Sequence, residues 1–176
     1  MACNLTTGRK IPCKSAFGGI KTVLFANFGT IASVDTVPAT GITTITNGSP
    51  APVWFEYDVK GVSSLETTVT SSRDNGTTFY TQTLNLTLTF LDALTNQELQ
   101  ILAVARPYIA VVDYYGNTFL CGLENGMECT GGTVFTGAAA GDLSGFTLTF
   151  EGMEETAPLF LNATPTASSS QIAPTG

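Results

Sequence analysis

The residues from Thr83 to Phe90 alternate strictly between polar and apolar side chains. In an extended chain one face carries Leu84, Leu86, Leu88 and Phe90, and the other carries Thr83, Asn85, Thr87 and Thr89. A period of two predicts a β-strand with one face in a core. The polar face has no charged residue, whereas a solvated strand face usually carries some Lys or Glu. We therefore expect this face to meet an assembly, either as the wall of a channel or as a contact with another subunit.

The composition fits a folded β protein of one domain. The chain has 176 residues, of which 43% are hydrophobic and only 12% are charged, against about 25% charged in ordinary soluble domains. The net charge is −7. Tight binding of nucleic acid needs Lys and Arg to displace counterions, so this balance argues against it.

A long hairpin is the clearest supersecondary element. Asn75–Gly76 is a strong hairpin signal and predicts a type I′ turn with both residues at positive φ. The flanking strands are expected at about 62–73 and 77–90. They exceed the usual strand length of about 5–6 residues, and the distal part "TTVTSSRDNGTT" is almost without apolar residues. We expect this hairpin to project from the domain and to be held by a partner.

Other strands follow from local patterns. We expect strands at 20–29, ended by Gly29, and at 108–115 and 118–124, with a last alternating strand through Phe146, Leu148 and Phe150. Residues 35–53 read as a loop or an irregular strand because of Pro38, Gly41 and Asn47–Gly48. The segment 53–60 predicts a strand with inward Phe55, Tyr57 and Val59 and outward Glu56, Asp58 and Lys60.

One helix is expected over 95–105. Thr95 and Glu98 fit a capping box. Leu99, Leu102 and Ala103 share one face, and Pro107 ends the helix. The prediction is a mainly β fold: an antiparallel β-sandwich or half-barrel with one short flanking α-helix and a long projecting hairpin. The expected divisions are an N-terminal arm (1–21), a β domain (22–161) and a C-terminal tail (162–176).

The sequence gives no sign of an enzyme. It has no histidine, so a Ser–His or Cys–His pair cannot form, and no nucleotide-binding or hydrolase motif is present. The spacing of Cys3, Cys13, Cys121 and Cys129 matches no zinc site. Free thiols are the first interpretation of these cysteines, and a disulfide formed outside the cell is the second. We expect no catalytic residue, no metal and no cofactor.

The termini and the charge distribution suggest where the protein works. The N-terminus "MACNLTTGRKIPCK" has no apolar core of a secretory signal, and no run approaches a membrane span. We expect synthesis in the cytoplasm and no membrane contact. Four of the seven basic residues lie in 1–34, which contain no acid. Arg9, Lys10 and Lys14 are therefore predicted to dock the arm on an acidic surface of a neighbouring copy.

The order of these elements resembles the tail tube proteins of tailed bacteriophages. The resemblance rests on "SSRDNGTTFYTQTLNLTL" (71–88), on the helix after it, and on "GDLSGFTLTFEGMEETAPLFL" (141–161). The opening "CNLTTGRKIPCKSAFGGIKTVLFANFG" (3–29) is also similar to the start of phage virion proteins. The resemblance as a whole covers most of the chain and lies in the order of the elements.

The resemblance implies a structural virion protein, made in the host cytoplasm. Copies form hexameric rings whose inner sheets join into one barrel, the rings stack into a tube with other tail proteins at its ends, and DNA passes through the lumen without sequence-specific binding. The hairpin and the arm reach the neighbouring ring. The expected hairpin contacts are Leu65, Thr67, Val69, Ser71, Arg73, Asp74, Asn75, Gly76, Thr78 and Tyr80, and the possible lumen face is Thr83, Asn85, Thr87 and Thr89.

Two other classes of function stay open on the sequence. One is a different virion ring or decoration protein, such as a tail terminator, neck, baseplate or capsid decoration component. The other is a monomeric carbohydrate-binding or adhesin domain, for which Trp54, Tyr114 and Tyr115 are the candidate aromatic residues. The number of copies in a particle separates the first from a tube, and a sizing column separates the second.

Overall fold

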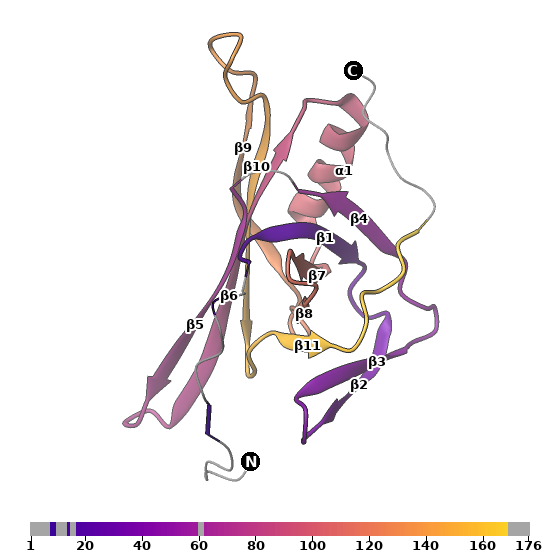
Figure 1. Ribbon diagram of the computed structural model, residues 1–176, viewed down its shortest axis with the longest axis vertical. Coiled ribbons are helices and arrows are strands. Elements are labelled where there is room, and N and C mark those ends of the chain that lie inside the picture. Colours follow the sequence, from indigo (N-terminus) through magenta and orange to yellow (C-terminus); the bar gives the residue numbers. More distant parts are fainter. Residues whose placement is uncertain (1–7, 10–13, 15–16, 60–61, 169–176) are drawn as a thin grey trace.

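The computed structural model describes residues 8–9, 14, 17–59 and 62–168. Two β-sheets pack face to face, and an α-helix lies beside them (Figure 1). The prediction of a β-sandwich with one short helix is confirmed. Within the described residues, no helix has the length and apolar character needed to cross a membrane.

The smaller sheet, sheet B, has four antiparallel strands. Their order is β5 (Ser64–Ser72), β6 (Thr77–Thr89), β10 (Gly145–Glu154) and β9 (Glu128–Phe135). The β5–β6 hairpin points away from the body in one direction and the β9–β10 hairpin points the other way (Figure 1). Leu84, Leu86 and Leu88 of β6 are buried, as the alternation predicts.

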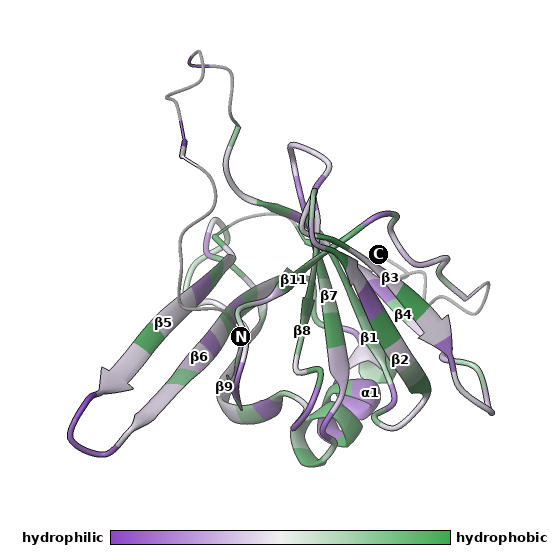
Figure 2. Cartoon of the chain, turned by 90° about the horizontal axis from the view of Figure 1, so that it is seen from below, coloured by the Kyte–Doolittle hydropathy of each residue, from purple (hydrophilic) through white to green (hydrophobic). Residues whose placement is uncertain are grey.

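The larger sheet, sheet A, has seven strands, and β3 pairs with β11 in parallel. The order is β2 (Ile31–Val37), β3 (Ile42–Asn47), β11 (Leu159–Leu161), β8 (Thr118–Cys121), β7 (Tyr108–Asp113), β1 (Ile20–Ala26) and β4 (Trp54–Asp58). Figure 2 shows sheet A and the β5–β6 hairpin diverging from one another, with a hydrophilic turn at the hairpin tip.

The main core lies between the two sheets. Phe150 of β10 packs on Phe25 of β1, with ring centroids 5.5 Å apart. Leu84 and Leu86 of sheet B and Ile109 and Val111 of sheet A complete the centre of this layer. Burying such apolar side chains is the main favourable term in folding.

A second apolar cluster covers the opposite face of sheet A. Its buried centre includes Leu24, Trp54 and Leu120, so the central strands β1, β7 and β8 of sheet A are buried on both faces. Residues 162–168, assigned to the C-terminal tail, lie across this face: Ser168 donates its backbone N–H to the carbonyl of Trp54 at 2.7 Å. Within this domain Trp54 is therefore a core residue.

The helix α1 (Ala93–Val104) starts earlier than predicted, and the predicted capping box is wrong. Its N-cap is Asp92, whose Oδ2 accepts the backbone N–H groups of Leu94 and Thr95 at 3.1 and 3.2 Å. A carboxylate at this position satisfies two free donors directly. Leu99 is buried and Leu102 packs on the main core, whereas Ala103 is exposed.

Several strand predictions need correction. Residues 35–53 contain two real strand segments, because Pro38 and Gly41 lie at the tight turn that joins β2 to β3. The strand predicted over 20–29 ends at Ala26, and β11 was not predicted.

Two aromatic residues predicted in the core lie outside it. Phe55 is 40% exposed because β4 is an edge strand. Phe90 is 69% exposed at φ 69°, since β6 ends at Thr89 and the chain turns away. Lys60 lies outside the described residues.

Candidate assembly surface

One face of sheet B packs on the core, and the opposite face, which we name the wall face, is open. The four predicted lumen residues, Thr83, Asn85, Thr87 and Thr89, lie together on it, because the alternate residues Leu84, Leu86 and Leu88 point into the core. The face continues on β10, where Thr147 pairs with Thr87 and Thr149 pairs with Asn85. It extends to β9 through Thr133, which pairs with Thr147.

Hydrogen bonds run across the wall face between strands. Thr149 donates its hydroxyl to Asn85 Oδ1 at 3.1 Å, and the hydroxyls of Thr133 and Thr147 bond to each other. Sequence reasoning missed Thr133, Thr147 and Thr149. The alternation through Phe146, Leu148 and Phe150 contained the signal for the last two, because its polar positions share the opposite face.

The only charges on the wall face are negative. Glu66, Glu151 and Glu128 stand in one row of directly opposed positions, with Thr83 between the first two. The four strands contain no Lys or Arg. A polyanion that meets this face finds hydroxyl and amide groups, the exposed side chain of Met153 and a row of carboxylates, but no cation to hold it.

The β5–β6 hairpin outruns its third strand. The last row shared with β10 is Val69, Tyr80 and Glu154. Three further pairs follow: Thr70 with Phe79, Ser71 with Thr78, and Ser72 with Thr77. This part extends about 17 Å with its turn, so the projection is shorter than the whole hairpin suggested.

The predicted hairpin residues do not all lie in that projection. Leu65 packs against the main core, and Thr67 faces Gln82, which pairs in turn with Gly152 of β10. Val69 is 56% exposed. Tyr80 lies at the edge of the sandwich, and Ser71 and Thr78 lie beyond it.

The hairpin turn differs from the predicted type. It spans Arg73–Gly76, and Gly76 donates its N–H to the carbonyl of Arg73 at 3.3 Å. Gly76 alone has a positive φ, of 63°, and Asn75 and Asp74 do not. Four residues therefore close the hairpin where two were predicted, which suits a turn of the type I family.

A buried polar cluster fixes the base of the hairpin. Glu154 is 2% exposed, and its two carboxylate oxygens accept the N–H groups of Glu124 and Asn125, each at 2.9 Å. Burial raises the pKa of Glu154, and these two hydrogen bonds partly oppose that shift. Gln82 accepts the N–H of Gly122 at 3.1 Å. These contacts attach the β8–β9 connection to sheet B.

The two cysteines that the structure describes, Cys121 and Cys129, have no neighbours that would activate a thiol. Cys121 is fully buried, and burial together with the nearby Glu154 raises its pKa to about 12. Cys129 is half-buried, and both are free; Cys3 and Cys13 lie outside the described residues. In the described part of the chain, no group of three or more acidic or cysteine side chains is placed to hold a metal ion.

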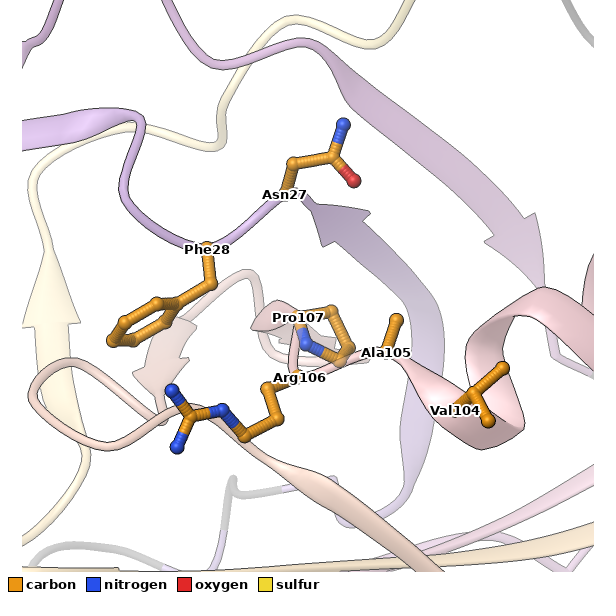
Figure 3. Close-up of a pocket in the computed structure, with 6 residues that line it drawn as sticks. All are labelled: Asn27, Phe28, Val104, Ala105, Arg106 and Pro107. Atoms are coloured by element: carbon orange, nitrogen blue, oxygen red, sulfur yellow. The ribbon is translucent and has the colours of Figure 1, made fainter.

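A shallow pocket of about 390 Å³ lies beside the end of α1 (Figure 3). Its walls are Asn27, Phe28, Val104, Ala105, Arg106 and Pro107. The Arg106 guanidinium lies 5.2 Å from the centre of the Phe28 ring. This is a packing contact, and the six residues offer no carboxylate, thiol or hydroxyl group.

The predicted basic arm is described only in part. Arg9 and Lys14 are exposed, and Lys10 lies outside the described residues. Ile20 and Lys21, assigned to the arm, already belong to β1. Comparison of the chain with protein-family models, curated proteins and solved structures gives no match.

Proposed function

We propose that this chain is a tail tube subunit of a tailed bacteriophage. Copies assemble into hexameric rings, the rings stack, and DNA leaves the particle through the lumen. The observation that carries this proposal is the wall face: a four-stranded sheet with its other face in the core and this one bare, hydroxylated and free of cations.

The chemistry of the wall face suits a passage for DNA. Threonine and asparagine side chains are hydrated without attracting phosphate, and the row of Glu66, Glu151 and Glu128 repels it. A lumen of this kind lets the duplex slide, because no counterion-releasing contact forms.

The edges of sheet B suit closure into a ring. In the described residues β5 and β9 are the outermost strands of the sheet. An unpaired strand edge tends to pair with another chain, and a closed barrel removes every edge. The hairpin beyond Tyr80 reaches the adjacent ring in this scheme, with Arg73, Asp74 and Asn75 at its tip.

Electron microscopy of the purified full chain tests the proposal. We expect filaments with a central hole. Single rings that do not stack would favour another virion ring, such as a terminator or neck component. A monomer at high concentration, measured by light scattering on a sizing column, would overturn the proposal.

A shortened hairpin tests its role separately. Replacing Thr70–Phe79 by Asn–Gly removes the part that outruns β10 and leaves the buried pairs of β5 and β6 intact. We expect an unchanged circular dichroism spectrum and no growth of filaments. Filaments of normal length from this variant would show that stacking does not need the hairpin.

A further inference from the structure

The two edge strands of sheet B are offset along the strand direction. β9 reaches from the row of Thr83 to the row of Thr89, whereas β5 reaches from the row of Asn85 toward the hairpin tip. They share only three rows. Pairing of β9 in one copy with β5 in the next at equal height therefore joins three residue pairs.

Charge also opposes that unshifted arrangement. At equal height Glu128 of one copy stands directly opposite Glu66 of the next, because both lie in the row of Thr83. Like charges at directly opposed positions destabilise a strand pair. The two carboxylates therefore disfavour this register.

A shift must be an even number of residues, since an odd shift exchanges the wall and core faces. Thr130 is the extra residue at a bulge in β9 and is left out of the pairing. With a shift of four residues or of six, all residues of β9 except Thr130 are paired with a residue of β5. Both shifts separate Glu128 from Glu66.

The apolar residues at the edges distinguish the shift of four residues from the shift of six. Val134 and Val69 lie on the core side of sheet B, yet they are 62% and 56% exposed. A shift of four places Val134 opposite Leu65 and Val69 opposite Cys129, so each exposed valine meets a partly buried apolar side chain. A shift of six places these valines opposite Thr67 and Gly132.

We infer that the subunit interface is an antiparallel pairing of β9 with β5 of a second copy in the register that joins Cys129 to Val69 and Val134 to Leu65. This inference rests on the proposed function, because it specifies how the ring closes. Glu128 then faces Thr70, and Glu66 faces Thr133, so no like charges meet at the seam.

The register also sets the inclination of the strands. Four strands about 4.8 Å apart make each copy about 19 Å wide, and a shift of four residues rises about 13 Å. The strands then tilt by about 35° from the ring axis, within reach of the 35–45° that closed barrels adopt. Six copies at this tilt form a barrel about 45 Å across between opposite backbones, wider than a DNA duplex with its hydration.

Cross-linking tests the register. In assembled Val69→Cys protein, mild oxidation joins the introduced thiol to the native Cys129 of the next copy, and each copy carries one thiol at each edge. We expect a ladder of covalent oligomers on a non-reducing gel that ends at six copies. The ladder is absent when Cys129→Ser is added and when the protein is oxidised as a dilute monomer.

Two matched variants probe the competing registers. Ser71→Cys faces Cys129 in the shift of six, and Leu65→Cys faces it in the unshifted pairing. Rings or tubes with a ladder from either variant, but none from Val69→Cys, overturn the register and leave the proposed function standing. A ladder that survives Cys129→Ser also overturns it. A chain that stays monomeric overturns both the register and the proposed function.

Discussion

Sheet A and sheet B are built from similar residues but differ in how many faces they bury. In sheet A, β1 is buried at six of its seven positions and β7 at five of six. In sheet B, β6 alternates through Leu84, Leu86 and Leu88, and its other face is open. A sheet buried on both faces supplies stability, whereas one buried on a single face keeps a surface and two edges for partners.

Threonine serves differently in the two sheets. In sheet A, Thr43 and Thr118 are buried, and their hydroxyls bond to those of Thr36 and Thr164, each at 2.8 Å. In sheet B the hydroxyls bond along an open face. Threonine hydroxyls therefore pair with one another in the interior of sheet A, whereas in sheet B threonine side chains cover an exposed surface.

The largest expected effect comes from introducing a lysine into sheet A, in comparison with a lysine introduced into sheet B. Thr43 is fully buried in sheet A, so Thr43→Lys leaves an unpaired charge in the interior, and we expect a loss of more than about 3 kcal/mol in the free energy of unfolding. Thr89→Lys lies on the exposed wall face, and we expect a change within about 0.5 kcal/mol. Denaturant titration measures both. Equal losses would contradict the assignment of the wall as an open face.

The next effect separates the two faces of one strand. Phe150 is fully buried between the sheets, and Phe150→Ala should cost about 3–5 kcal/mol. The substitution Thr149→Ala at the neighbouring residue removes one neutral hydrogen bond to Asn85 and should cost about 1 kcal/mol or less. Thermal unfolding ranks the pair. A Thr149→Ala loss as large as that of Phe150→Ala would break the comparison.

A pH dependence should appear at Glu154, on the buried face of β10. Because burial raises its pKa in the folded state, its stability contribution is complete below the unfolded pKa of about 4.3 and is lost as the pH rises through the folded pKa. Between pH 4 and pH 7 the wild type should therefore lose unfolding free energy relative to the Glu154→Gln variant. Glu151→Gln, on the wall face of the same strand, is the control. A pH-independent difference for Glu154→Gln would show that burial does not govern this carboxyl group.

The smallest effect lies where β6 leaves sheet B. Phe90 adopts φ 69°, a conformation that costs phenylalanine more free energy than glycine, and its ring is largely exposed. Phe90→Gly should raise the free energy of unfolding by about 1 kcal/mol. Leu91→Gly, at a residue without positive φ, should lower it. A destabilised Phe90→Gly variant would mean that the ring makes contacts that outweigh the backbone strain.

Only the part of the wall face that lies on β6 was predicted. Thr83, Asn85, Thr87 and Thr89 follow from period two within one strand. Thr133 and the glutamate row depend on which strands pair and in which register, and a local pattern does not contain that pairing. The predictions that Phe55 and Phe90 are buried failed for related reasons. Phe55 lies on an edge strand and Phe90 follows the end of a strand, and both places expose residues that periodicity alone assigns to the core.

The amino-acid sequence by itself determined that this chain forms β-structure, that β6 has one apolar and one uncharged face, and that a hairpin runs past its neighbours. These properties are local, because side chains two residues apart share a face whatever surrounds the strand. Only the tertiary structure decided that the central strands of sheet A are buried on both faces, that Glu154 anchors the β8–β9 connection, and that the edges of sheet B are offset. Those features join residues far apart in the chain, and packing between the sheets fixes them.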